Sequence, residues 1–180
     1  MGTSGTPVSG YELAIQDENG MRLDKGESGE LLVRGGSALA FYWHQKAKTR
    51  ASLQGAWFAT GDRYHQDDDG YFVYEGRVDD MMKVGGLWVS PVEIENRLME
   101  HASVVEAAVV GVSVDGLTQI KAFVIAAQVD HDSEDSFADT LRAWCKDGLD
   151  RYKFPKLVEF VTDFPRTATG KIQRFKLRAG

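Results

Sequence analysis

Hydrophobic and polar residues alternate in short stretches from Tyr11 to Tyr74, with turn residues between the stretches. The stretches read YELAIQD, GELLVRG, WFATGDRY and GYFVYEG. Alternation with a period of two, interrupted by Gly, Asn and Asp, is typical of antiparallel strands. The pattern predicts a β-rich, distorted barrel-like region, with one short helix over residues 46–53 and an entering loop over the first ten residues.

A helix start signal follows Arg77. Ser90, Pro91 and Glu93 form a capping box with proline at the first helical position, where its missing N–H costs nothing. The signal predicts a helix over residues 91–101. One face of this helix is marked by Val92, Ile94, Glu95 and Leu98.

The remaining pattern mixes strands and helices. Residues 104–114 and 120–129 are rich in apolar residues and flank the Asp115-Gly116 turn signal, which predicts a β-hairpin. Apolar residues at helical spacing predict a second helix over residues 133–149, and residues 157–161 read as a last strand. The fold class is therefore α+β, with a β-rich unit over residues 1–78 and a small α+β unit over residues 79–180.

Composition excludes several classes of protein. A chain of 180 residues with 43% hydrophobic residues is long enough for one large domain or two small ones. The net charge of −6 argues against generic binding of nucleic acid or anionic membranes, and no apolar run approaches the length of a membrane span. The single cysteine, Cys145, excludes an intramolecular disulfide and fits a cytoplasmic location.

Charge is distributed unevenly along the chain. Residues 151–180 hold eight Lys or Arg against two Asp or Glu, on an otherwise acidic body. Such a basic end suggests contact with a compact anion such as a polyphosphate, or packing on an acidic neighbour. A solvated tail is the alternative, and charge alone favours it.

No metal site or self-contained nucleotide site is predicted. The histidines at positions 44, 65, 101 and 131 have no partner at helical spacing and no cysteine pair. Residues 65–70 faintly resemble a calcium loop, but His65 and Gly76 stand where its carboxylates belong, so a hairpin turn is expected. The chain also lacks a nucleophile elbow and a phosphate-binding loop of the Gly-x-x-x-x-Gly-Lys type.

Three other segments carry candidate chemistry. Asp62, in Thr-Gly-Asp at residues 60–62, can accept two hydrogen bonds from a ribose diol, although an ordinary turn is the simpler reading. Residues 76–95 gather Arg, Lys, Asp and two adjacent Gly around the predicted domain boundary. Lys171 follows a Thr/Gly-rich turn, which makes it either a cation on a flexible loop or one more solvated lysine.

The order and spacing of six segments resemble the C-terminal signatures of the adenylate-forming superfamily. That family includes acyl-CoA and aryl-CoA synthetases, peptide-synthetase adenylation domains and firefly luciferase. Residues 76–112 look most similar to bacterial benzoate-CoA ligases and close aryl-CoA ligases. The six segments are residues 29–35, Thr-Gly-Asp at 60–62, Gly-Arg-Val-Asp at 76–79, Gly85-Gly86 with Glu-Ile-Glu at 93–95, Lys-Phe-Pro at 153–155, and residues 165–171.

The resemblance implies an acid–thiol ligase that works in two steps. A carboxylic acid attacks the α-phosphate of ATP to give an acyl-adenylate, and coenzyme A then displaces AMP to give a thioester. The resemblance implies a small aromatic carboxylic acid as substrate. It also implies Mg²⁺, bound mainly by residues upstream of this chain.

The resemblance also assigns roles to residues of the nucleotide site. Asp62 matches the residue that holds the ribose hydroxyls, and Arg77 matches the arginine beside the ribose and phosphate of AMP, where a permanent planar cation suits an anion. Tyr74 falls near the adenine-contacting position. The alternative for Tyr74 is an aromatic of the strand core.

Further assignments concern the two half-reactions. Lys171 matches the adenylation lysine, which offsets the repulsion between carboxylate and triphosphate in the transition state. Asp79 matches the hinge about which a small C-terminal domain rotates between the steps. Lys83, Gly85 and Gly86 match the face turned to the site for thioester formation, where glycine lets a slender pantetheine arm approach the backbone; a tight turn is the other reading of the glycine pair.

Members of the family carry several hundred upstream residues, including a phosphate-binding loop and the acyl pocket. The resemblance therefore implies that residues 1–78 are the last subdomain of a large N-terminal domain and that residues 79–180 are a mobile lid. The expected partner is that missing N-terminal domain, and the chain alone is expected to be inactive. The alternative is a non-catalytic module that binds an anion or a protein and carries inherited motifs.

Overall fold

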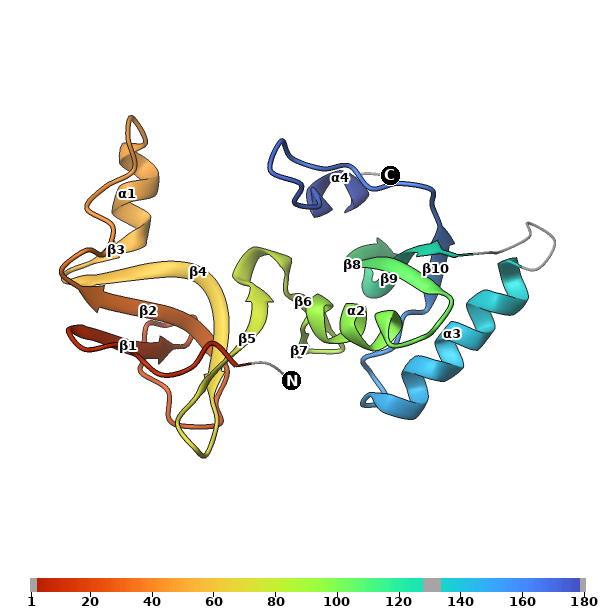
Figure 1. The fold of residues 1–180 in the computed structure, drawn as a ribbon, viewed down its shortest axis with the longest axis horizontal. Helices are drawn as coiled ribbons and strands as arrows, with labels where there is room; N and C mark the ends of the chain where they lie inside the picture. The colour runs from red at the N-terminus through yellow and green to blue at the C-terminus, as the bar shows by residue number, and fades with distance from the viewer. Residues whose placement is uncertain (1–2, 128–133, 179–180) are drawn as a thin grey trace. The chain divides into compact units, whose positions relative to one another are not determined.

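The computed structural model describes residues 3–127 and 134–178, and its fold is mixed α+β as expected (Figure 1). The chain divides into two compact units, residues 1–79 and residues 80–180. His131, the first residue of the helix expected over 133–149 and the end of the strand expected over 120–129 lie outside the described residues.

The first unit is built on one curled antiparallel sheet. Its strands run in the order β1 (Tyr11–Gln16), β2 (Gly29–Gly35), β4 (Trp57–Gln66) and β3 (Leu53–Gln54), and β5 (Phe72–Arg77) also pairs with β4. The β2–β4 and β4–β5 registers both shift along their length, and such irregularities bend and twist a strand. Ile15, Leu31 and Phe72 form the buried core of this unit.

Two local predictions in this unit are confirmed. Residues 67–70 form the tip of the β4–β5 hairpin, where the Gly70 N–H donates to the Asp67 carbonyl over 3.0 Å and the Tyr71 N–H donates to the Asp67 carboxylate over 2.7 Å. The short helix α1 (Lys46–Ser52) also forms, and none of its residues is buried, so it stands out from the sheet of this unit (Figure 1).

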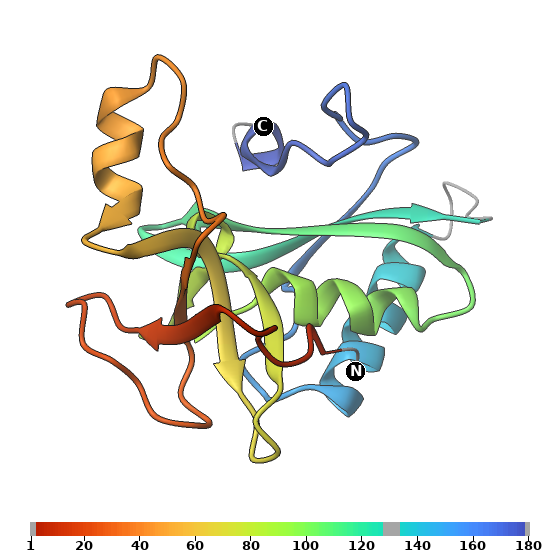
Figure 2. The ribbon, with the colours of Figure 1, turned by 60° about the vertical axis from the view of Figure 1, so that its left-hand side comes forward.

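The second unit has three layers (Figures 1 and 2). Its central sheet pairs β8 (Val104–Val114) with β9 (Leu117–Ala126) in antiparallel fashion and β9 with β10 (Leu157–Phe160) in parallel. Helices α2 (Pro91–Met99) and α3 (Glu134–Gly148) cover one face of this sheet. The C-terminal segment, residues 161–178, covers the other face and ends in α4 (Arg174–Arg178).

Successive side chains of a strand point to opposite faces of the sheet, so the apolar residues of β8 and β9 contribute to two separate cores. Val109 and Ile120 pack against the helices with Ile94, Leu98 and Leu141, and we call this cluster the helix-side core. Ala108, Val110 and Phe123 pack against Phe164 of the C-terminal segment, and we call this smaller cluster the tail-side core. The helix-side core is the larger of the two.

The start of α2 agrees with its sequence signal. The Ser90 hydroxyl accepts a hydrogen bond from the Glu93 N–H over 3.3 Å, and Pro91 occupies the first turn. Of the face expected to pack inward, Ile94, Leu98 and Glu95 are buried. A carboxylate that is buried on this apolar face of α2 requires a hydrogen-bonding or oppositely charged partner, which is described below.

Several short elements were not predicted from the sequence. They are β3, a one-turn 3₁₀ helix over Val78–Asp80, the hairpin of β6 (Met82–Val84) and β7 (Leu87–Val89), and α4. Strands of two or three residues are too short to display a period of two. Among the helices of the described ranges, none has both the length and the apolar composition needed to cross a bilayer.

The single cysteine gives a simple test of the helix-side core. Cys145 is fully buried in α3, and burial raises the pKa of its thiol to about 11. Because the thiolate is the reactive form, the native chain should not react with a thiol reagent such as dithionitrobenzoate at pH 8, whereas the denatured chain should release one equivalent of chromophore. Ala143→Cys, at an exposed site of the same helix, is the positive control. Fast modification of the native wild-type thiol would contradict this packing.

Candidate functional site

The candidate ribose-binding carboxylate and the candidate phosphate-binding arginine lie side by side in the first unit. Asp62 and Arg77 are paired in the β4–β5 register, and the Arg77 Nη1 donates to the Asp62 Oδ1 over 2.7 Å. The Asp62 side chain is 31% exposed and that of Arg77 is 48% exposed. The strand pairing thus presents an acceptor and a planar cation together at an accessible position.

A glycine makes this arrangement possible. A Cβ placed on Gly61 would lie 2.8 Å from the Arg77 Nη2, which is closer than real Cβ atoms approach. Gly61 also has φ of +73°, a backbone conformation that L side chains rarely adopt. The glycine between Thr60 and Asp62 therefore leaves the space over which the Arg77 guanidinium lies.

Tyr74 does not belong to the core of the first unit. Its side chain is 40% exposed, and its ring meets the Tyr64 ring edge-on with centroids 5.4 Å apart. The alternative of a core aromatic is therefore wrong. The ring lies at the surface of the first unit, three residues before Arg77.

Asp79 lies in the 3₁₀ turn over Val78–Asp80, and it is the last residue of the first unit. Its side chain is exposed. The residue expected to act as the hinge is therefore at the division between the two units, in a short element with no buried residue.

The glycine pair forms the tip of the β6–β7 hairpin. Gly85 and Gly86 have φ of +58° and +88°. Positive φ at both central residues is typical of two-residue hairpin turns, and glycine adopts it readily. A Cβ on either residue would meet no atom within 4 Å, so the backbone of the tip is open to a ligand. Lys83 lies opposite Trp88 in the register, with its ammonium 5.3 Å from the ring centroid.

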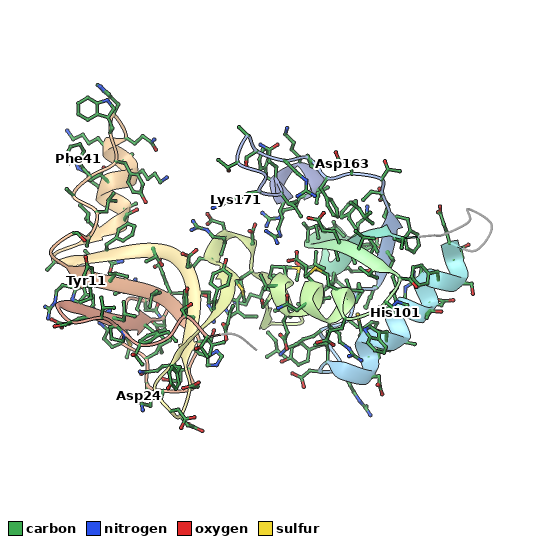
Figure 3. All side chains as sticks on the ribbon, viewed as in Figure 1. Tyr11, Asp24, Phe41, His101, Asp163 and Lys171 are labelled. Atoms are coloured by element: carbon green, nitrogen blue, oxygen red, sulfur yellow. The ribbon has the colours of Figure 1, made fainter. Side chains whose placement is uncertain are left out.

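Lys171 lies on a closed turn in the C-terminal segment, which is the loop before α4 in Figure 3. The Thr167 N–H donates to the Lys171 carbonyl over 2.9 Å, and the Lys171 N–H donates to the Thr167 hydroxyl over 3.1 Å. The Gly170 N–H donates to the Thr167 carbonyl over 2.9 Å. The expectation of a flexible loop is therefore corrected: the backbone that carries this lysine is hydrogen-bonded.

Both sides of the turn are anchored. Phe164 before it and Ile172 after it pack in the tail-side core. Arg166 donates to the Gly170 carbonyl over 3.2 Å and forms an ion pair with Glu106 of β8. The side chain of Lys171 itself is exposed, and its ammonium has no hydrogen bond or ion pair with the part of the chain that the structure describes.

A buried ion pair behind the turn was not predicted. Glu95 is 5% exposed, and its carboxylate accepts hydrogen bonds from Arg174, whose Nη2 lies 2.8 Å from Oε2 and whose Nε lies 3.1 Å from Oε1. The Val109 N–H also donates to the Glu95 Oε1 over 2.8 Å. Burial raises the pKa of Glu95, while Arg174 and the Val109 N–H act in the opposite direction.

The same cluster includes the first residue of the second unit. Asp80 lies 3.7 Å from the Arg174 Nη1 and 2.5 Å from the Arg178 Nη2. The position of Glu95 within an apolar stripe was the one signal in the sequence that could have pointed to this cluster. Its partner is 79 residues away in the chain, so no local pattern identifies it.

Half of the eight cations of the basic tail form ion pairs with described residues of their own unit. Arg166, Arg174, Arg178 and Lys153 form ion pairs with acidic residues of the second unit, which are Glu106, Glu95, Asp80 and Glu93. The expectation that the tail packs on acidic neighbours is therefore confirmed for these four cations. A freely solvated basic tail is not what the structure contains.

Within residues 3–127 and 134–178, no three His, Cys, Asp or Glu side chains gather in a way that could hold a metal ion. The described residues therefore do not form a metal site made of protein ligands alone. The candidate residues that remain are Lys171, the Asp62–Arg77 pair and the glycines at the tip of the β6–β7 hairpin.

Comparison with known proteins relates these positions to a family. Residues 93–171 match the model of the AMP-binding enzyme C-terminal domain, and the match ends at Lys171. The benzoate–CoA ligase of Thauera aromatica is 47% identical over 180 residues, and the 4-hydroxybenzoate–CoA/benzoate–CoA ligase of Rhodopseudomonas palustris is 45% identical over 178 residues. The matches cover 99% and 98% of this chain, which spans only about a third of each relative, 34% and 33%.

Solved structures agree with the fold. The anthranilate CoA ligase AuaEII, solved in complex with anthranoyl-AMP, matches 99% of this chain with a TM-score of 0.91 and 46% identity, over 34% of that structure. A benzoate CoA ligase from Burkholderia xenovorans matches 98% of this chain with a TM-score of 0.86 and 46% identity, over 35% of its own length. Residues 93–171, which include Lys171, thus match the AMP-binding enzyme C-terminal domain, and nearly the whole chain is similar to about one third of the length of these aryl-CoA ligases.

Proposed function

We propose that the chain is the C-terminal part of an ATP-dependent aryl-CoA ligase whose substrate is benzoate or a close relative. The carboxylate attacks the α-phosphate of ATP, which forms the acyl–oxygen–phosphorus linkage of an acyl-adenylate and releases pyrophosphate. The thiol of coenzyme A then attacks the acyl carbon, which forms the thioester, releases AMP and frees the thiol proton. The names of the similar enzymes support an aromatic acid.

The observation that carries the proposal is the exposed ammonium of Lys171 on a hydrogen-bonded turn. In the proposed reaction, this ammonium contacts the carboxylate and α-phosphate oxygens as negative charge accumulates on them. A cation held by a fixed backbone is most effective against charge that develops in the transition state, because little reorganisation is needed. Lys171 is then a catalytic residue of the first step.

Three side chains of the first unit serve the nucleotide in this proposal. The Asp62 carboxylate accepts hydrogen bonds from the ribose hydroxyls, and Arg77 contacts the ribose and phosphate of AMP. Tyr74 contacts the adenine. Their support is the Asp62–Arg77 pairing at 2.7 Å and the exposure of all three side chains.

The second step uses another face of the second unit. The pantetheine arm of coenzyme A runs along the backbone of Gly85 and Gly86, and Lys83 lies beside it. Rotation about Asp79 exchanges this face for the one that bears Lys171, so residues 79–180 act as a mobile lid and residues 1–78 as the last subdomain of a larger N-terminal domain. The open, glycine-only hairpin tip supports this use of β6 and β7.

The first test is to restore the missing part. We define the assembled enzyme as this chain supplied with an upstream portion, either from its own longer protein or from the Thauera aromatica relative. The assembled enzyme should release pyrophosphate from ATP in the presence of benzoate and then form a thioester with coenzyme A, while the chain alone should do neither. An upstream portion without this chain is the matched control. Absence of pyrophosphate release from a folded assembled enzyme, with several aromatic acids, would contradict the proposal.

A further inference from the structure

Glu95 is a buried carboxylate for which the proposed chemistry gives no role. It lies on the inward face of α2, and the fork of Arg174 contacts both of its oxygens. The third contact, from the Val109 N–H, ties the same carboxylate to β8 of the central sheet. One side chain therefore connects a helix, the sheet and the segment that carries Lys171.

Stability is a poor explanation for this arrangement. Burial disfavours the charged form of Glu95 even with Arg174 in contact, and buried ion pairs are often no more stabilising than apolar residues of similar volume. In some proteins, buried polar or ionic groups of this kind specify one arrangement over others. The arrangement specified here is the position of the C-terminal segment.

The spacing connects the pair to the reactive lysine. Arg174 begins α4, and only two residues separate it from Lys171. The turn is already fixed on its other side by Arg166 and Glu106. Asp80, next to the proposed hinge, forms additional ion pairs with Arg174 and Arg178. A displacement of Arg174 would therefore be passed to the turn within a few bonds.

From these contacts we infer that Arg174, through Glu95 and Asp80, is a positioning residue that sets the place of Lys171 for adenylate formation. The inference rests on the proposed function, because it concerns the same lysine. Arginine suits the task better than lysine does, since its planar fork makes two parallel hydrogen bonds to one carboxylate and so fixes direction as well as distance.

The catalytic test separates the two half-reactions in the assembled enzyme. Arg174→Gln should lower the kcat of pyrophosphate release about 10- to 100-fold with little change in the KM for ATP, because a misplacement of about 1 Å can cost about 100-fold. Thioester formation from supplied benzoyl-adenylate should change much less. Arg174→Lys should recover part of the rate. Lys176→Gln, which removes an exposed cation from the same helix, is the matched control and should leave both steps unchanged.

A second measurement covers the possibility that the variant is poorly folded. Backbone hydrogen exchange of the 180-residue chain should be faster in residues 166–177 of Arg174→Gln and unchanged in β8 and β9. This result would show that the pair holds the C-terminal segment rather than the whole unit. Faster exchange in β8 and β9, with an equal loss of both half-reactions, would overturn the inference in favour of a purely structural role.

The remaining outcomes are also decisive. If Lys171→Ala abolishes adenylate formation and Arg174→Gln leaves it unchanged, the inference is wrong and the proposed function stands. If Lys171→Ala itself leaves adenylate formation unchanged, the catalytic role assigned to Lys171 is wrong and the inference falls with it, whereas a wild-type assembled enzyme that forms no adenylate would overturn the proposed function.

Discussion

Replacing Lys171 with alanine in the assembled enzyme is expected to lower the rate of adenylate formation by about 100- to 1000-fold, the loss found when a single charge-stabilising donor is removed from an active site. The physical reason is the repulsion between a carboxylate and a triphosphate, which one ammonium offsets at the point where their charges approach each other. The measurement is pyrophosphate release with ATP and benzoate. In the structure, the ammonium is exposed and its turn is closed by hydrogen bonds, as this role requires.

The second half-reaction is the internal control for this variant. Thioester formation from supplied benzoyl-adenylate and coenzyme A should be largely intact in Lys171→Ala, because the proposed contact is made only in the first step. Lys176→Ala, a substitution at another exposed lysine of the same segment, should leave both rates unchanged. Equal loss of both half-reactions in Lys171→Ala would argue against the assigned role.

Fixing the backbone at Asp79 is expected to impair thioester formation more than adenylate formation, which is the reverse of the effect of Lys171→Ala. Proline sets φ near −65° and also restricts the preceding residue, Val78, so Asp79→Pro removes the torsional freedom that a hinge needs. Thioester formation from supplied adenylate should fall by about tenfold or more, a barrier increase of at least about 1.4 kcal/mol, while adenylate formation should be affected less. Single-turnover kinetics of the two steps provide the measurement.

Asp79→Ala separates the backbone from the side chain. The alanine variant loses the carboxylate but keeps its torsional freedom, so it should retain far more thioester formation than the proline variant does. If Asp79→Pro forms the thioester at the wild-type rate, residue 79 is not the hinge. If the alanine and proline variants lose activity equally, the carboxylate rather than the backbone matters at this position.

Elements set by local chemistry were predictable from the sequence. The helix at residue 91 followed from Ser90, Pro91 and Glu93, whose cap contact is present in the structure. The β8–β9 hairpin followed from two apolar runs around Asp115-Gly116, and both of these residues have positive φ. In such cases the signal and the structure it produces lie within a few residues of each other.

Features that depend on distant partners were not predictable in this way. The parallel pairing of β10 with β9 joins strands separated by α3, and the contact between Glu95 and Arg174 joins residues 79 positions apart. The Asp62–Arg77 pair depends on the register of β4 with β5, which shifts between Arg63 and Tyr64. Only the family resemblance pointed to Asp62 and Arg77 together, and it carried no information on their direct contact.

The presence of two cores on opposite faces of one sheet has a consequence for how the second unit loses structure. The free energy needed to open part of a protein locally depends on how much apolar surface that part packs. The C-terminal segment, which packs on the small tail-side core, should therefore open at a lower free energy than the strands and helices around the larger helix-side core. A damaged or proteolysed molecule could thus lose the packing of residues 161–178 while the sheet and the helices of the helix-side core stay folded. Such a molecule would still look intact by its overall helix and strand content, although Lys171 would no longer be held in its turn.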